Sequence, residues 1–292
     1  MPEREVSTFA YAKVNLGLAI IGLREDGYHE LQTVMQSIDL HDTVHISRQG
    51  TGIVCECGDL SGSDNLAYRV AELFMKRLGM HDGLKIKIDK NIPLQAGLAG
   101  GSSDAAATLR GLNRIYGKPL GYNDLKEIAD SCGSDIAFCL KGGTQWIAGR
   151  GESLEELPEV PEMHLVIVKP SQGVNTAEAY RRFDRSGKTS SLDRSFWAKV
   201  LQEKEISKIA GLLKNDLESV SVELVPVISE IKKVLVDLGC YNSLMSGSGS
   251  AVFGIARDNN HAAEVAGILS GKGLGQVWKS VTVSGVSEDY FR

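Results

Sequence analysis

The fold of this chain is decided by the stretch Pro93-Leu94-Gln95-Ala96-Gly97-Leu98-Ala99-Gly100-Gly101-Ser102-Ser103-Asp104-Ala105-Ala106. Its glycines, Gly97, Gly100 and Gly101, allow the backbone to adopt positive φ angles and to approach a ligand closely. The alanine-rich segment from about Ser103 predicts a helix, whose unpaired N–H groups and positive dipole end would point into the loop. A glycine-rich loop followed by a helix N-terminus is suited to binding a di- or triphosphate.

The loop matches neither of the two common phosphate-binding motifs. Ser102, and not lysine, follows Gly101, so it is not a Walker A loop, and the glycines do not have the Gly-x-Gly-x-x-Gly spacing. The hydroxyls of Ser102 and Ser103 are able to bond phosphate oxygens or a bound cation. Taken alone, the glycines favour phosphate binding and a serine-capped flexible turn about equally.

Two further segments bear on the same chemistry. Residues 8–18 are β-prone and predict a strand that carries Lys13 and Asn15. Far along the chain, Met245-Ser246-Gly247-Ser248-Gly249-Ser250 precedes a β-prone run, which predicts a tight turn entering a strand. By itself this second loop favours an ordinary Gly/Ser turn more than a binding loop.

Hydrophobic periodicity predicts a mixture of helices and strands without a regular βαβ repeat, which is typical of the α+β class. We predict two domains, residues 1–160 and 161–292, joined through an acidic surface connection at 149–161 and followed by a polar loop at 184–193. Further predicted strands cover 44–47, 52–55, 84–89, 165–168, 250–255 and 280–284, and predicted helices cover 65–78, 103–113, 122–132, 196–201 and 219–238.

Composition excludes several classes of protein. With 292 residues, 42% hydrophobic and 24% charged, the chain predicts a packed core. Its net charge of −5 argues against a nucleic-acid partner, and no stretch reaches the ~18 apolar residues of a membrane helix. Five irregularly spaced cysteines predict reduced thiols, and Cys55-Glu56-Cys57 offers too few ligands for a metal site. We expect a soluble cytoplasmic protein, a monomer or weak homodimer, with no membrane partner.

The order and spacing of the three segments resemble the three motifs of the GHMP kinase superfamily, over essentially the whole chain. Within it, further segments are similar to the diphosphocytidyl-methylerythritol kinases. They are Ala12-Lys13-Val14-Asn15-Leu16, Asp26-Gly27-Tyr28-His29-Glu30-Leu31, Asp64-Asn65-Leu66, Gly133-Ser134-Asp135-Ile136-Ala137-Phe138 and Gly149-Arg150-Gly151-Glu152. The chain departs from the family pattern at Ala99, Ala137 and Leu244, where glycine, proline and a basic residue are usual.

The resemblance implies a two-domain GHMP kinase fold with the active site in the cleft between the domains. It further implies that Asp135 is the general base and that Lys13 holds the attacking hydroxyl and Asp135 in register. Without the resemblance, the residues favour other readings: Asp135 as a helix N-cap, and Lys13 as a lysine that snorkels from a strand to water.

The resemblance also implies the ligand-binding residues. Asn15, Tyr28, His29 and Tyr180 would hold a cytidine diphosphate-linked alcohol, with the tyrosines stacking on cytosine and His29 reading its polar edge. Asn65 and Lys90 would flank the adenine and ribose of ATP. The ATP phosphates would lie on Pro93, Leu94, Gln95, Ala96, Gly97, Leu98, Ala99, Gly100, Gly101, Ser102 and Ser103. Mg²⁺ should accompany ATP, with Ser102 or Ser103 as candidate protein ligands.

The activity so implied is ATP-dependent phosphorylation of the 2-hydroxyl of 4-diphosphocytidyl-2-C-methyl-D-erythritol, a step of non-mevalonate isoprenoid precursor biosynthesis. Two alternatives stay open at this point. One is a GHMP kinase for another alcohol, such as mevalonate or homoserine, against which the aromatic Gly27-Tyr28-His29 segment argues. The other is a non-catalytic ligand sensor on the same fold, which would be free to lose Lys13 and Asp135.

Overall fold

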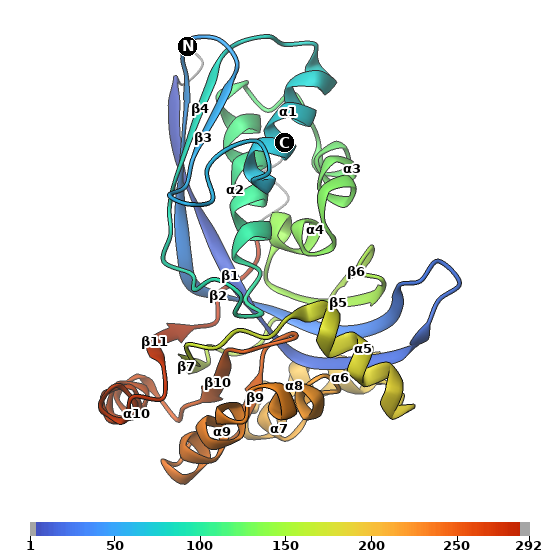
Figure 1. Cartoon of the computed structure of the whole chain (residues 1–292), viewed down its shortest axis with the longest axis vertical. Coiled ribbons are helices and arrows are strands. Elements are labelled where there is room, and N and C mark those ends of the chain that lie inside the picture. Colours follow the sequence, from blue (N-terminus) through green and yellow to red (C-terminus); the bar gives the residue numbers. More distant parts are fainter. Residues whose placement is uncertain (1–3, 287–292) are drawn as a thin grey trace.

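The computed structural model describes residues 4–286, and residues 1–3 and 287–292 lie outside it. The described chain forms two layered parts, each a sheet covered by helices, which meet near the middle of the molecule (Figure 1). The predicted α+β class is confirmed. None of the helices described is long and apolar enough to cross a membrane.

The first part is built on two long antiparallel strands, β1 (Glu5–Leu23) and β2 (His29–Arg48). The sheet is completed by β3 (Ile53–Glu56), β4 (Leu84–Asp89), β5 (Thr144–Gly149), β6 (Ser153–Glu156) and β8 (Lys214–Asn215). Burial alternates along the start of β1, where one face of the sheet is open to water, and becomes continuous from Ala12 to Ile20. This second half of β1 is covered on both faces because the second part of the molecule packs against it.

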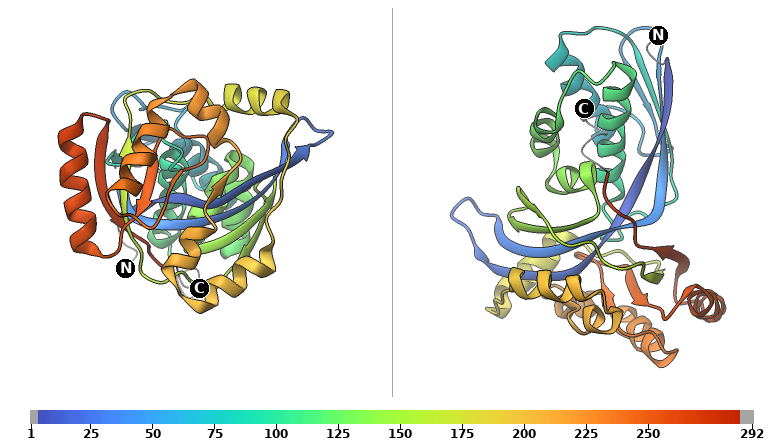
Figure 2. Two further views of the ribbon diagram at one scale, coloured as in Figure 1. Left: turned by 90° about the horizontal axis from the view of Figure 1, so that it is seen from below. Right: turned by 180° about the vertical axis from the view of Figure 1, so that it is seen from behind.

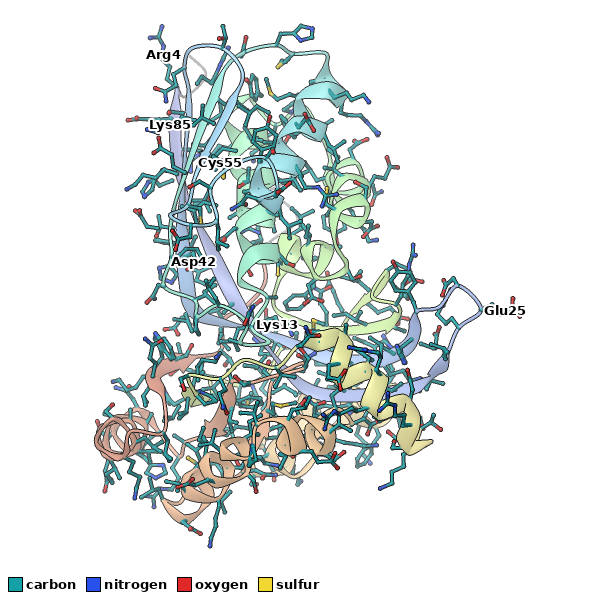
Figure 3. The ribbon with its side chains drawn as sticks, viewed as in Figure 1. Arg4, Lys13, Glu25, Asp42, Cys55 and Lys85 are labelled. Carbon is teal, nitrogen blue, oxygen red and sulfur yellow. The ribbon has the colours of Figure 1, made fainter. Side chains whose placement is uncertain are left out.

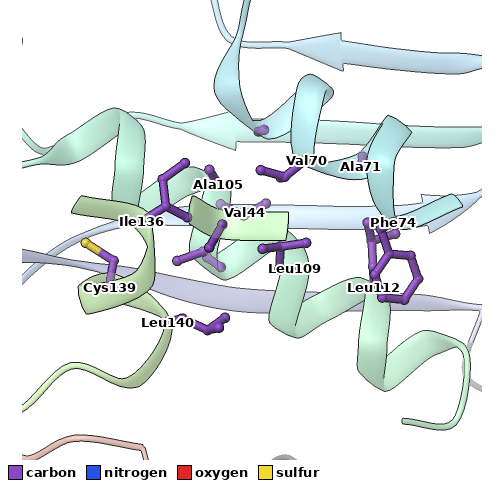
Figure 4. Close-up of a cluster of buried hydrophobic side chains, with 14 of the residues drawn as sticks. Val44, Val70, Ala71, Phe74, Ala105, Leu109, Leu112, Ile136, Cys139 and Leu140 are labelled. Atoms are coloured by element: carbon purple, nitrogen blue, oxygen red, sulfur yellow. The ribbon is translucent and has the colours of Figure 1, made fainter. Parts of the chain in front are cut away.

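Four helices cover one face of this sheet: α1 (Leu66–Leu78), α2 (Gly100–Ile115), α3 (Tyr122–Cys132) and α4 (Ser134–Lys141) (Figure 1). Figure 4 shows part of the resulting core, a single cluster of buried side chains that includes Phe74 of α1, Leu109 of α2, Val44 of β2 and Ile136 of α4. All four side chains are fully buried, and each stabilises the fold by about 1.5–3 kcal/mol through loss of contact with water. This core fixes the N-termini of α2 and α4, where the phosphate loop and Asp135 lie.

The second part has a four-stranded sheet in the order β11-β7-β10-β9, formed by β7 (His164–Lys169), β9 (Ser243–Met245), β10 (Val252–Ile255) and β11 (Gln276–Val281). Its helices lie around this sheet and beneath the β1–β2 hairpin (Figure 2). They are α5 (Thr176–Ser186), α6 (Arg194–Glu203), α7 (Ile206–Gly211), α8 (Glu218–Leu224), α9 (Val227–Asp237) and α10 (Asn259–Lys272).

Besides the chain segment between β6 and β7, two further segments connect the two parts. β8, from the second half of the sequence, pairs in parallel with Gly17 and Leu18 of β1. After β11 the chain returns to the first part, where Thr282 forms a bridge with Ile38 of β2. A domain boundary at 160/161 stays a prediction, supported by the change of sheet between β6 and β7.

Several predicted elements differ from the structure. The predicted strand 44–47 is only the end of β2, whose earlier residues include buried polar side chains such as Gln36 and Asp42 that obscure the alternation. The predicted helix 219–238 is divided into α8 and α9 at Pro226, because proline has no N–H to continue a helix. The predicted loop 184–193 overlaps the end of α5, and β6 lies in the predicted connection at 149–161.

Candidate active site

A cleft of about 1000 Å³ lies where the two parts of the molecule meet. It is lined by Lys13 and Asn15 of β1, by the start of β2, by the loop before α2, by the start of α4, by α5, and by the loop after β9. Figure 3 shows Lys13 at this junction, and Glu25 at the far tip of the β1–β2 hairpin. The cleft therefore brings together the three segments that the sequence singles out.

Lys13 and Asn15 are two residues apart on β1 and so project from the same face of the strand. Lys13 is only 3% exposed, and its Nζ donates a hydrogen bond of 2.6 Å to Oδ1 of Asn15. Burial lowers the pKa of Lys13, and the neighbouring carboxylate of Asp135 opposes that shift. The snorkelling alternative is therefore wrong, because the ammonium group points into the protein and not to water.

Asp135 lies in the first turn of α4, with an oxygen 3.9 Å from Nζ of Lys13. The N-cap of α4 is Gly133, and no side chain makes a capping hydrogen bond there, so the capping alternative for Asp135 is wrong. Its carboxylate is 35% exposed and lines the cleft. Asp135 therefore lies beside both the positive end of the α4 dipole and the Lys13 ammonium, two groups that attract a carboxylate.

The glycine-rich loop of residues 93–103, here called the phosphate loop, approaches the loop after β9, here called the third motif, most closely at Gly97. Its φ is +74°, and a Cβ at this position would lie 2.0 Å from the backbone oxygen of Ser246. Ser246 Oγ donates to the Gly97 oxygen at 2.9 Å, and Ala251 N donates to the Ala96 oxygen at 3.2 Å. Glycine is required at position 97 because any side chain would push the two loops apart.

The rest of the loop differs from the sequence prediction. α2 begins at Gly100, three residues before the predicted start at Ser103, so Gly100 and Gly101 belong to its first turn. Besides Gly97, the loop residues with positive φ are Gln95 and Ala99. Ala99 takes the left-handed conformation at the position where the family has glycine. A Cβ at Gly100 would meet the side chains of Ile92 and Lys90 at 3.1 and 3.3 Å, and close approach of this glycine to a phosphate stays a prediction.

The two serines after the glycines have different surroundings. Ser103 is buried, and its hydroxyl donates to the Tyr11 oxygen at 2.6 Å and contacts the sulfur of Cys139. Its hydroxyl therefore bonds to groups in the protein interior, which corrects the expectation that Ser103 faces the phosphates or a cation. Ser102 is partly exposed and is the serine that remains accessible.

Lys90 and Asn65, expected at the adenine, do not line the cleft. Lys90 Nζ forms ion pairs with Asp104, at 2.7 Å, and with the buried Asp42. Burial raises the pKa of Asp104 to about 7, and its Oδ1 has no hydrogen-bond partner among the described residues. Asn65 is the N-cap of α1, where its side chain accepts from Ala67 N at 2.9 Å. Both residues therefore have structural partners of their own.

The other loop residues are divided between interior and surface. Ala96 and Leu98 are buried in the core between the two parts, Leu94 is exposed, and Gln95 and Ala99 line the cleft. Pro93 lies between the core residue Ile92 and Leu94 and does not line the cleft. The departures Ala137 and Leu244 are buried in the two cores and change no group that faces the cleft.

The opposite end of the cleft is aromatic. Tyr28 lies beside the hairpin tip with 57% of its surface exposed, and the Arg150 guanidinium lies 5.4 Å from its ring centroid. Also in the cleft, the rings of His29 and Tyr180 are 4.5 Å apart at 30°. Burial raises the pKa of Tyr180 to about 12, so its hydroxyl stays protonated and able to donate.

Sequence reasoning missed Asp184, whose Oδ1 lies 2.7 Å from His29 Nε2. Tyr180 and Asp184 are four residues apart on α5, a spacing that puts both side chains on one face of the helix. A carboxylate on Nε2 fixes the ring orientation and tautomer of His29, and so leaves Nδ1 for a ligand. The i,i+4 spacing of Tyr180 and Asp184 can be read from the sequence. It does not indicate that Asp184 contacts His29.

Comparison with known proteins gives two family matches. The profile of the GHMP kinases N terminal domain matches residues 65–143, and that of the GHMP kinases C terminal matches residues 198–273. A 4-diphosphocytidyl-2-C-methyl-D-erythritol kinase of Desulfitobacterium hafniense (strain Y51) is 50% identical over 97% of this chain and 98% of its own. The enzyme of the same name from Acetivibrio thermocellus is 42% identical over 88% of this chain and 92% of its own.

Solved structures agree with these matches. A crystal structure of 4-(cytidine 5'-diphospho)-2C-methyl-D-erythritol kinase has a TM-score of 0.84 at 34% identity, and covers 97% of this chain and 100% of its own. Homoserine kinase from Cytophaga hutchinsonii has a TM-score of 0.74 at 21% identity, covering 98% of this chain and 96% of its own. The second likeness shows the shared fold alone.

Proposed function

The chain belongs to the 4-diphosphocytidyl-2-C-methyl-D-erythritol kinase family of the GHMP kinases, and we propose that it transfers the terminal phosphoryl group of ATP to the 2-hydroxyl of 4-diphosphocytidyl-2-C-methyl-D-erythritol. It is a phosphotransferase with an alcohol acceptor, acting in non-mevalonate isoprenoid precursor biosynthesis. The observation that carries the proposal is one cleft that holds the Lys13–Asp135 pair, the phosphate loop and an aromatic end with a histidine.

Asp135 is the proposed general base. It accepts the proton of the attacking hydroxyl while that oxygen forms its bond to the terminal phosphorus and the bond to the ADP oxygen breaks. Its partial exposure to the cleft supports this role, since a substrate hydroxyl can approach the carboxylate from the cleft.

Lys13 is the proposed electrostatic partner. Its ammonium donates to Asn15 and lies within ion-pair distance of Asp135, which leaves it able to hold the alkoxide that develops during transfer. Asn15 supports the pair, because its Oδ1 fixes Nζ of Lys13 and its Nδ2 donates to Thr33 Oγ1 at 2.8 Å. The pair is thus oriented before substrate binds.

The loop Gln95–Ala99 and the N-terminus of α2 are the proposed site for the ATP phosphates. No group of three or more His, Cys, Asp or Glu side chains among the described residues could hold a metal ion by itself. A Mg²⁺ ion would therefore be held by Ser102, water and the ATP phosphates, and would supply charge neutralisation when bound. Backbone N–H groups of the loop orient the phosphate chain.

Tyr28, His29 and Tyr180 are the proposed cytosine site. Their rings come from the hairpin and from α5, two segments that are far apart in the sequence. Stacking on the tyrosines gives affinity for the base, and His29, oriented by Asp184, reads its polar edge. Mevalonate and homoserine have no base to stack, so they would leave this end of the cleft empty.

The test is incubation of the protein with ATP, Mg²⁺ and a panel of alcohols, with product identified by mass. We expect phosphorylation of the cytidyl alcohol and little turnover of mevalonate or homoserine. Faster turnover of either would overturn the substrate assignment, and the absence of turnover on every alcohol would favour the sensor alternative. A cytoplasmic location and a monomeric or weakly dimeric state stay predictions from the sequence.

A further inference from the structure

The loop after β9 is held from behind by one short segment of the second part. Asn215 of β8 donates from Nδ2 to the backbone oxygens of Met245, at 2.8 Å, and Gly247, at 2.7 Å. Glu218 accepts from Met245 N at 3.0 Å, and Ser221 donates to the Ser248 oxygen at 3.1 Å. Residues 215–221 therefore hold the side of the loop that faces away from the phosphate loop.

This segment is itself anchored on the strand that carries Lys13. β8 pairs with β1 at Gly17 and Leu18, and Asp216 accepts from Ile20 N at 2.9 Å. Asn215 is buried, and its Oδ1 accepts from Leu217 N at 3.0 Å, so its amide orientation is fixed. Asn215 therefore holds the loop after β9 in a fixed position relative to β1.

The direction of the Gly247–Ser248 peptide follows from this contact. In a trans peptide the C=O and N–H groups point to opposite sides, so the Ser248 N–H points away from Asn215. Gly247 and Ser248 line the cleft, and a Cβ on Gly247 would lie 3.4 Å from Nζ of Lys13. Neither the Gly247 nor the Ser248 N–H has a hydrogen-bond partner in residues 4–286.

We propose that Asn215 is a positioning residue for phosphoryl transfer, which fixes the Gly247–Ser248 peptide so that its N–H donates a hydrogen bond to the transferred phosphoryl group. This rests on the proposed kinase activity. Such a donor acts mainly where negative charge develops, and it needs no reorganisation during the reaction because the loop is already held.

The first test is Asn215→Asp, which keeps the volume and removes the donors to both carbonyl oxygens. We expect kcat to fall about 10²-fold while the KM values for ATP and for the alcohol change less than about threefold, the pattern of an interaction made in the transition state. Affinity for MgADP with aluminium fluoride, a mimic of the transferred group, should fall in parallel with kcat.

The matched control is Asn242→Asp. Asn242 has the same chemistry, with Nδ2 donating to the Ala210 oxygen at 2.8 Å and Oδ1 accepting from Ser243 N at 2.9 Å, but it does not line the cleft. We expect a lower melting temperature and a kcat within about threefold of the unmodified enzyme. Equal losses of kcat in the two variants would overturn the positioning role.

A second measurement uses the unmodified protein and so does not depend on a variant that folds. The amide of Ser248 should exchange with solvent at least about tenfold more slowly when MgADP and aluminium fluoride are bound, as followed by NMR. An unchanged exchange rate would overturn the proposal. An unmodified enzyme that binds this complex but does not phosphorylate the cytidyl alcohol would instead contradict the proposed substrate.

Discussion

The two ends of the cleft are built in different ways. At the phosphoryl-transfer end, Lys13 and Asn15 are 3% and 1% exposed, and the Gly97 and Ser246 loops are hydrogen-bonded to each other. At the aromatic end, Tyr28 is 57% exposed beside the hairpin tip, and the His29 side chain joins the hairpin to α5 through contacts with Asp184 and Tyr180. The first end is fixed by backbone geometry, whereas the second depends on side-chain contacts, and one of its side chains, Tyr28, is exposed.

This difference agrees with the two tasks that we propose for the two ends of the cleft. Phosphoryl transfer depends on groups held in place before the substrate arrives, because any reorganisation adds to the barrier. Base recognition depends on contact area and on a few polar groups, and these can be completed as the ligand binds. Changes at the first end should therefore lower kcat, and changes at the second should raise KM.

The largest effect is expected for Asp135→Asn. The substitution is nearly isosteric and leaves the α4 cap unchanged, since Asp135 makes no capping hydrogen bond, but asparagine cannot accept the proton. We expect kcat to fall about 10²–10⁴-fold with little change in KM or melting temperature. Steady-state kinetics beside a melting curve would test this, and a near-normal kcat would remove Asp135 as the base.

Tyr180→Ala should show the opposite pattern at the aromatic end. The loss of one stacking surface is expected to cost about 1–3 kcal/mol in binding, so KM for the cytidyl alcohol should rise about 5–150-fold while kcat changes little. Tyr180→Phe is the control, because it keeps the ring. A large loss of kcat in Tyr180→Ala would show that the two ends of the cleft are not independent.

Asp184→Ala should have a smaller effect at the same end. Without the carboxylate on Nε2, His29 can change tautomer and orientation, so we expect KM for the cytidyl alcohol to rise about tenfold. The ¹⁵N shifts of the His29 ring report the tautomer directly. Unchanged shifts together with an unchanged KM would show that the contact does not orient His29.

The stability of the protein is expected to depend on pH through Asp104, which lies in α2 directly after the phosphate loop. The pKa of Asp104 is raised to about 7 by burial, so the folded state holds this proton more tightly than the unfolded state. Its contribution to stability is fully present below the unfolded pKa, near 4, and is lost as the pH rises through about 7. Melting temperatures between pH 5 and 8 should fall less steeply in Asp104→Asn than in the unmodified protein, and equal slopes would contradict the shift.

The smallest effect is expected for Ala99→Gly. Ala99 has a φ of +58°, a conformation that costs an alanine about 1 kcal/mol, and glycine removes most of that strain. Because glycine also makes the unfolded chain more flexible, we expect a net gain of about 0.5 kcal/mol in the free energy of unfolding. Urea denaturation measures it, and a lower stability would show that the alanine methyl group makes a stabilising contact.

The sequence by itself determined several local elements and marked the main loop as a candidate binding site. The strand 84–89 and the helix 122–132 were predicted with the bounds they have as β4 and α3, because alternation and helical spacing are local properties. The loop before α2 could be recognised as a candidate phosphate site because its glycines and the following helix are adjacent in the chain, and the family resemblance favoured that role over a plain turn. Its contact with the loop after β9 depends on how the two parts of the molecule pack, and spacing along the chain does not predict it.

The tertiary structure alone decided several of the contacts between polar side chains. Asp184 lies 155 positions from His29, and Asn215 lies 30 and 32 positions from the carbonyl groups that it holds. It also decided that Ser103 and Lys90 point into the protein, to Tyr11 and to Asp42 with Asp104. Periodicity indicates which face of an element is buried, but a hydrogen bond between distant segments depends on how those elements pack, and no local spacing encodes that.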